Sequence, residues 1–168
     1  ALIHQNNIRR IIRALEMVHG GTSYARQAEG SASRDSHYHS SFIGLTLPRL
    51  ALYERIGVRV DRMLERGLVA EIEELLESGL RGAITASQAI GYKEFIPVID
   101  GNMPLEQAVE QVKQATRRYA KRQLTWFRAD ERVRWIDVTE MSPERVLDRT
   151  FELIESGEPS PYPFEAGE

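Results

Sequence analysis

The sequence predicts a mainly α-helical chain that contributes about two strands to a larger α/β sheet. About six segments repeat apolar residues with the period of an amphipathic helix. Two short segments, SFIGLTLP (41–48) and VRWIDV (133–138), are instead typical of strands, the first of a buried strand. Two strands are too few for an independently stable sheet. We therefore expect a fragment of a longer protein, in keeping with a first residue that is not Met.

The first helix is predicted from its caps. Asn6 or Asn7 can cap a helix whose apolar positions begin at Ile8, and Gly20-Gly21 would end it. The residues that follow, 21–41, are polar and rich in Ser, Gly and His, so we expect a loop or a mobile link.

Four helices are predicted between the two strands. Amphipathic spacing favours helices over 49–66 and 68–78, and glycines separate them. Ser87 is a candidate cap for a third helix that runs through 88–99. Residues 104–128 form the longest predicted helix.

The C-terminal end is predicted to be a helix and a tail. Ser142 is an N-cap candidate and Pro143 occupies the first helical position, so the helix would run to about Ser156. The Pro-, Gly- and Glu-rich residues from Gly157 onward predict a frayed end.

The composition excludes several classes of protein. At 42% hydrophobic and 28% charged residues, the chain is typical of a globular protein. No apolar run approaches the roughly 20 residues of a membrane helix. The absence of Cys excludes disulfides, thiol nucleophiles and Cys-ligated zinc, and we expect a cytoplasmic location.

Positive charge is concentrated in KQATRRYAKRQLTWFR (113–128), although the formal net charge of the chain is −3. At 100° per residue the cations share one side of the predicted helix. Such a face normally mixes signs, because pairs of opposite charge stabilise a helix. A polyphosphate partner explains the arrangement better than a solvated face, which remains the alternative. The six cations are Lys113, Arg117, Arg118, Lys121, Arg122 and Arg128.

The opposite side of this helix is predicted to be core. It includes Tyr119, Trp126 and Phe127, with Gln123 in the middle of the apolar arc. A buried amide must find hydrogen-bond partners. Gln123 would therefore either tie the helix to a neighbouring backbone or belong to a site.

The helix over 49–66 carries a second cationic stripe, formed by Arg55, Arg59 and Arg62. Arg59 lies at the edge of the apolar arc, where a partly desolvated guanidinium suits bidentate phosphate contact. The alternative is a side chain that extends over the edge of the core.

The motifs of other site classes are absent or weak. His37-Tyr38-His39 lacks a carboxylate at metal-ligand spacing, so no metal site is predicted. The sequence contains no G-x-x-x-x-G-K-[ST] loop and no G-x-S-x-G elbow.

Four segments carry a resemblance to a known family. QAIGYKE (88–94) and ATRRYAKRQLTWFR (115–128) resemble motifs of the tRNA dimethylallyltransferases, and GLTLPRLALYERIGVRVDRMLERGLVAEIEELLESGL (44–80) resembles the segment before those motifs. HQNNIRRIIRALE (4–16) is similar to the family's His-Pro-Asn-Asp helix, from which Gln5 and Asn7 depart.

The resemblance implies a fold and a reaction. These enzymes move a dimethylallyl group from its diphosphate to the exocyclic amine of an adenosine beside the tRNA anticodon. Their fold is a P-loop NTPase-like α/β core with a helical insertion. Residues 1–39 would be the end of the insertion and its link, 40–157 the C-terminal part of the core, and 158–168 a flexible tail. Mg²⁺ as cofactor and a monomeric full-length enzyme are also implied.

The resemblance also implies roles for single residues. Arg59 matches an Arg that helps to hold the diphosphate. Apart from the resemblance, Gln123, Arg122 and Arg128 are polar candidates for a structural or a site role. The residues expected to contact tRNA are Arg9, Arg10, Arg13, Gln88, Gly91, Tyr92, Lys113, Gln114, Arg117, Arg118 and Lys121.

Two parts of the family's machinery are not in the sequence, namely the Gly-rich phosphate loop and an Asp that acts as general base. We therefore expect the chain to be inactive alone. An adenylate prenyltransferase and a non-catalytic RNA-binding module are the alternatives. The first would need less basic surface, and the second would be favoured if the phosphate loop were missing from the native protein.

Overall fold

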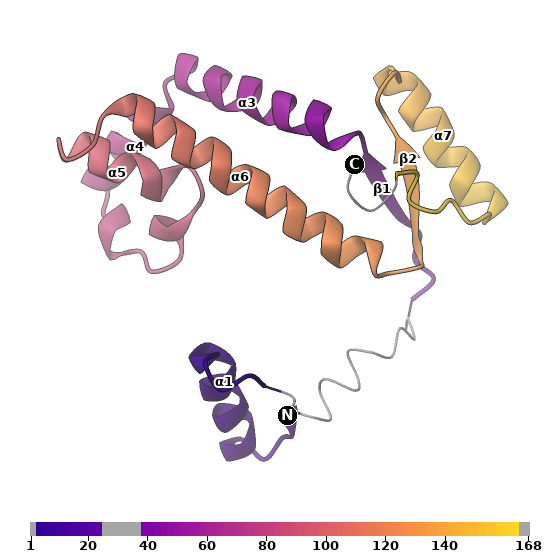
Figure 1. Cartoon of the computed structure of the whole chain (residues 1–168), viewed down its shortest axis with the longest axis horizontal. Helices are drawn as coiled ribbons and strands as arrows, with labels where there is room; N and C mark the ends of the chain where they lie inside the picture. The colour runs from indigo at the N-terminus through magenta and orange to yellow at the C-terminus, as the bar shows by residue number, and fades with distance from the viewer. Residues whose placement is uncertain (1–2, 25–37, 165–168) are drawn as a thin grey trace. The chain divides into compact units, whose positions relative to one another are not determined.

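A computed structural model describes residues 3–24 and 38–164, which fall into two compact units, Ala1–Ser40 and Ser41–Glu168. In the first unit, α1 spans Ile8–His19 (Figure 1). The side chain of Asn7 accepts a hydrogen bond from the backbone N of Arg10 at 3.2 Å, so the predicted cap is confirmed. Most of the predicted link, residues 25–37, lies outside the described residues.

The second unit is mainly helical and contains two strands among its described residues, which confirms the predicted fold class (Figure 1). No helix among the described residues is long and apolar enough to cross a membrane. The elements, in order, are β1 (Phe42–Thr46), α3 (Arg49–Glu65), α4 (Leu68–Glu77), η1 (Leu80–Gly82), η2 (Ala86–Gln88), α5 (Tyr92–Ile99), α6 (Leu105–Arg128), β2 (Val133–Asp137) and α7 (Pro143–Ser156).

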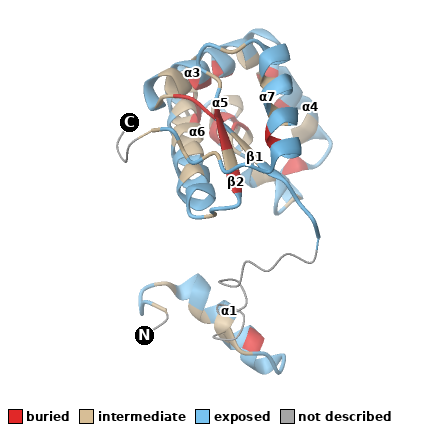
Figure 2. Ribbon diagram, turned by 90° about the vertical axis from the view of Figure 1, so that its right-hand side faces the viewer, coloured by how far each residue is buried: buried red, intermediate tan, exposed pale blue. Residues whose placement is uncertain are grey.

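Helices α3 to α6 form the core of this unit. Phe95 of α5 and Ile72 of α4 have no exposed surface, and Ala108 and Val112 bring the first half of α6 into the same cluster. Figure 2 shows buried segments on these helices, and also on β2 and α7.

The two strands are parallel, with Gly44 opposite Trp135. The prediction of a buried first strand is wrong for Phe42 and Leu45, which are 39% and 55% exposed. Among the described residues β1 pairs only with β2, so its outer edge is not covered by another strand. The backbone of β1 is instead closely packed at Gly44, against side chains of β2. A Cβ at this position would lie 2.7 Å from the Trp135 ring and 2.9 Å from Val133.

Helix α5 starts later than predicted. Ser87 and Gln88 form a separate 3₁₀ turn, so Ser87 is not the N-cap. The reason is Gly91, whose φ of 100° interrupts a helix that would begin at residue 88. Gly91 becomes the cap residue, and its backbone N donates to the buried Glu94 carboxylate at 2.9 Å.

The C-terminal helix has the predicted cap, because the Ser142 hydroxyl accepts from the backbone N of Arg145. The tail beyond it is tied to β2. The backbone N of Trp135 donates to the carbonyl of Ser160 at 2.8 Å, and the Ser160 hydroxyl donates to the carbonyl of Trp135 at 2.7 Å. Hydrogen bonds and ring contacts thus join residues 160–164 to β2. Residues 165–168 lie outside the described residues.

We predict that Gly44→Ala lowers the free energy of unfolding by about 1–3 kcal/mol, because the new methyl group overpacks against Trp135 and Val133. Equilibrium urea unfolding of the chain measures this change. Gly57→Ala in α3 is the matched control, since a Cβ there meets nothing within 4 Å. It should stabilise the helix by up to about 1 kcal/mol. Equal effects of the two variants would contradict the close approach at Gly44.

Candidate nucleic-acid interface

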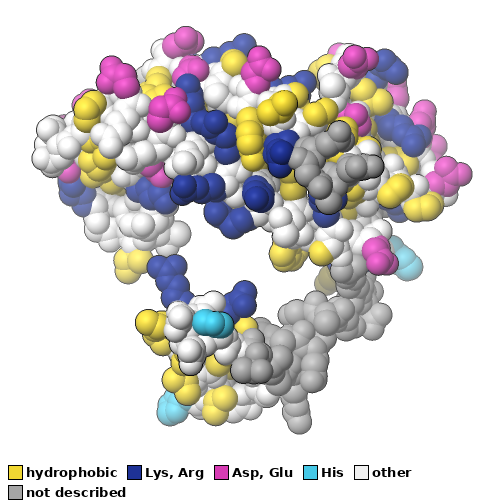
Figure 3. Space-filling model, viewed as in Figure 1, with side chains coloured by type: hydrophobic (Ala, Val, Ile, Leu, Met, Phe, Trp, Pro, Cys, Tyr) yellow, Lys and Arg dark blue, Asp and Glu magenta, His cyan; other side chains and the backbone are white. Residues whose placement is uncertain are grey.

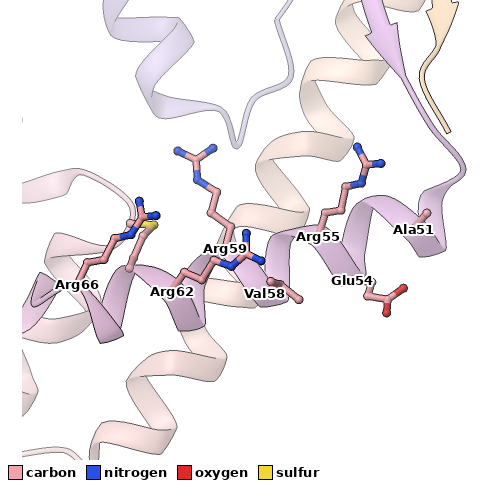
Figure 4. A pocket seen from close by; sticks show the side chains of 8 residues that line it. Ala51, Glu54, Arg55, Val58, Arg59, Arg62 and Arg66 are labelled. Atoms are coloured by element: carbon pink, nitrogen blue, oxygen red, sulfur yellow. The ribbon is translucent and has the colours of Figure 1, made fainter. Parts of the chain in front are cut away.

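An arginine stripe runs along α3. Arg55, Arg59, Arg62 and Arg66 fall within a sector of about 60° around the helix axis, and all four are exposed. They line an open groove together with Ala51, Glu54, Val58 and Met63. Figure 4 shows Arg55, Arg59 and Arg66 projecting to the same side of α3. No ion pair joins the stripe to an acid among the described residues.

Arg59 lies beside the buried side of α3, as expected, because the next residue, Val60, is 3% exposed. Its own side chain is exposed, so the expected partial desolvation is wrong for the described residues. Asp61, which pairs with Lys113 of α6, lies about 160° from Arg59 around the axis, so the stripe and this contact with α6 are on opposite flanks of α3. Arg66 was missed by the sequence analysis, although the same spacing extended by one turn would have found it.

The second half of α6 presents the α6 cationic face, which consists of Arg117, Arg118, Lys121, Arg122 and Arg128. Arg117, Lys121 and Arg128 fall within about 40° of one another and form a row about 16 Å long. Figure 3 shows Lys and Arg side chains gathered over the middle of this unit. Like charges held in a row on one helix attract a polyanion.

Lys113 does not belong to this face. Its side chain is only 17% exposed, and its Nζ lies 2.7 Å from Asp61 of α3 and 3.9 Å from Glu110. Its positive charge is neutralised within the fold, unlike the charges of the exposed cations further along α6. Both acids lie outside the segment 113–128, so the composition of that segment alone could not predict the ion pairs.

Three arginines of the α6 cationic face also make local contacts. Arg117 lies 3.8 Å from Glu110 and its Cζ 6.0 Å from the Tyr53 ring centroid. The guanidinium groups of Arg122 and Arg128 lie over aromatic rings, at 5.6 Å from the Tyr119 centroid and 4.1 Å from the Tyr162 centroid. A guanidinium held against a ring keeps its N–H edges available for phosphate or base contacts.

The predicted core side of α6 is buried only in its first half. Tyr119, Trp126 and Phe127 are 47%, 71% and 39% exposed, so their assignment to the core is wrong for the described residues. Gln123 is exposed rather than buried. It lines an apolar hollow between α6 and the strands, together with Leu52 and others. The helix has 24 residues, and its second half extends past the cluster of α3, α4 and α5.

The remaining predicted residues occupy different settings. The Tyr92 hydroxyl donates to the Glu71 carboxylate, and this hydrogen bond raises the pKa of Tyr92. Gly91 is buried at the start of α5, whereas Gln88 and Gln114 are exposed. In the other unit, Arg9, Arg10 and Arg13 are all exposed, and Arg13 pairs with Glu16 at 3.2 Å.

The described residues contain no cluster of three or more His, Cys, Asp or Glu side chains that could hold a metal ion.

Comparison with known proteins shows which family has this sequence. The sequence model of the IPP transferase family matches residues 1–130. The chain belongs to the IPP transferase family. The resemblance found in the sequence is thereby confirmed.

Individual relatives agree with this family. The chain is 50% identical over 139 residues to a tRNA dimethylallyltransferase of Bacillus velezensis, covering 83% of the chain and 44% of that protein. It is 44% identical over 148 residues to the Carboxydothermus hydrogenoformans protein of the same name, covering 88% of the chain and 47% of the relative. The chain thus spans about half the length of the curated relatives it matches.

Solved structures of IPP transferases share the fold. A Staphylococcus epidermidis tRNA isopentenylpyrophosphate transferase superposes with a TM-score of 0.69 at 40% identity, over 93% of this chain and 50% of the other. A eukaryotic dimethylallyltransferase described as acting on tRNA gives a TM-score of 0.74 at 28% identity, over 96% of this chain and 44% of the other.

We predict that Lys113 and Asp61 stabilise the packing of α3 on α6. A double-mutant cycle with Lys113→Met and Asp61→Asn should give a coupling free energy of about 0.5–1 kcal/mol in urea unfolding, because one partner is largely buried. The control is Arg149–Glu152 on α7, at 2.9 Å and exposed on both sides, which should couple by about 0.5 kcal/mol or less. Coupling no larger at Lys113 than at Arg149 would contradict the structural role of Lys113.

Proposed function

We propose that the longer protein containing this chain transfers a dimethylallyl group from dimethylallyl diphosphate to the exocyclic amine of an adenosine beside the tRNA anticodon. The observation that carries the proposal is the α6 cationic face on a chain of the IPP transferase family. Four exposed cations and the half-buried Arg117, all on half of one helix, fit a partner with many phosphates better than a small substrate.

The transfer breaks the carbon–oxygen bond to the diphosphate and forms a carbon–nitrogen bond to the adenosine. Negative charge develops on the leaving diphosphate, and the attacking amine loses a proton to a base. This chain would supply charge stabilisation through Arg59. The phosphate loop and the Asp base implied by the family resemblance are not in its sequence. The proposed activity is accordingly that of the longer protein.

The two cationic surfaces suit two different partners. The arginine stripe and Asp61 lie on opposite flanks of α3, and Asp61 faces α6 through Lys113. We assign the arginine stripe, through Arg59, to the diphosphate and the α6 cationic face to tRNA. The proposed tRNA contacts also include Gln88, Gly91, Tyr92 and Gln114, and Arg9, Arg10 and Arg13 of the first unit. Mg²⁺, a monomeric enzyme and a cytoplasmic location belong to the same proposal and rest on the resemblance.

An adenylate prenyltransferase is the second candidate enzyme, and the extent of positive charge on the surface of α6 argues against it. A non-catalytic RNA-binding module would use the α6 cationic face but leave the arginine stripe without a ligand. The two alternatives are separated from the proposal by testing free adenylate and tRNA as acceptors for the full-length protein.

We predict that Arg59→Ala slows single-turnover prenyl transfer at saturating tRNA by about 10²–10³, because the leaving group is deprived of one charge-assisted donor. Affinity for tRNA should change little. Arg59→Lys should recover only part of the rate, since Lys keeps the charge without the bidentate geometry.

The reverse pattern is expected on α6. Arg117→Ala and Lys121→Ala should each weaken tRNA binding and lower the slope of its salt dependence by about one, because one phosphate fewer is neutralised. Arg149→Ala on α7, outside both surfaces, is the matched control and should change neither property. If Arg59→Ala transfers at the unmodified rate while binding tRNA poorly, the assignment of the two surfaces is wrong.

A further inference from the structure

The tail after α7 returns to the end of α6. Gly157, with φ of 67°, ends the helix. The chain then reaches β2, where the backbone of Ser160 accepts a hydrogen bond from Trp135 at 2.8 Å. This contact lies outside the stretch that the IPP transferase family model matches, residues 1–130.

Tyr162 is the centre of an aromatic cluster on this tail. Its ring meets the Trp135 ring edge-on at 5.1 Å and the Phe164 ring edge-on at 5.6 Å. The Arg128 Cζ lies 4.1 Å from its centroid, the shortest of the cation–π distances in the described residues. The tail therefore holds the last residue of α6 through a side chain that is itself fixed on β2.

Arg128 stays exposed while it is stacked. It makes no ion pair with an acid among the described residues. Its position continues the row of Arg117 and Lys121 along α6, at the same angular sector. A guanidinium that is oriented by a ring, retains its charge and ends a cationic row is prepared to bind a phosphate.

We propose that Tyr162 is a positioning residue that holds Arg128 in the α6 cationic face, and that residues 157–164 thereby form part of the RNA-binding surface. The inference rests on the proposed function, because tRNA is the ligand it assumes. The physical reason is preorganisation: a long side chain already held in one orientation loses less conformational freedom when a phosphate binds.

The test uses the full-length enzyme and a tRNA transcript with adenosine beside the anticodon. Tyr162→Leu should weaken tRNA binding by about twofold to fivefold, the size expected for one exposed cation–π contact. It should raise KM for tRNA with little change in kcat. Tyr162→Phe keeps the ring and should retain the affinity. In an Arg128→Ala background, Tyr162→Leu should have no further effect on tRNA affinity.

The outcomes separate this inference from the proposed function. Prenyl transfer and tRNA binding by the unsubstituted enzyme support the function, and their absence sinks both proposals. If that enzyme is active and Tyr162→Leu binds tRNA with unchanged affinity, the inference alone is wrong. Thermal unfolding of each variant is measured in parallel. Equal losses of affinity in the Arg128 and Arg128→Ala backgrounds would show that Tyr162 only stabilises the fold.

Discussion

The burial of the first half of α6 against α3 and α5 fixes the direction of every charge on its second half. Ala108 and Val112 anchor the helix in a core that also contains the fully buried Phe95. A helix is stiff, so the rotation set at these positions is carried along to Arg128. The orientation of the α6 cationic face is thus a consequence of apolar packing several turns away, and charge–charge interactions among the cations do not set it.

The same packing determines which cations of α6 are paired with acids of the fold and which stay exposed. Lys113 lies where α6 crosses α3, and Asp61 and Glu110 neutralise it. Four residues later, Arg117 is partly engaged by Glu110 and Tyr53. Lys121, one turn further on, has no acid partner among the described residues. Available charge therefore increases along the helix as it leaves the core.

Local signals in the sequence predicted most of the fold and the location of both cationic surfaces. The α1 and α7 caps depend on side chains within three residues, and the period of α6 is a property of α6 alone, so the sequence predicted both. Three other features depend on contacts between residues distant in the sequence, and the sequence did not predict them. Lys113 finds Asp61 on another helix, Tyr162 reaches Arg128 from the tail, and Gln123 is exposed because the core ends before it. The break at Gly91, directly before α5, was also not predicted. Unlike the other three features it had a local signal, because a glycine inside a helical pattern lowers the expectation of a continuous helix.

The pairing of β1 with β2 has a consequence for the order in which the chain folds. The two strands are neighbours in the sheet, yet all of α3 to α6 lies between them in the sequence. Contacts among these helices close shorter loops, so they cost less chain entropy than joining the strands first. We expect the helical core to form early and to bring the strands together. The tail can bind only after β2 is in place, because Ser160 pairs with Trp135 on that strand. During synthesis, the pairing of β1 with β2 is therefore possible only after all of these helices have been made.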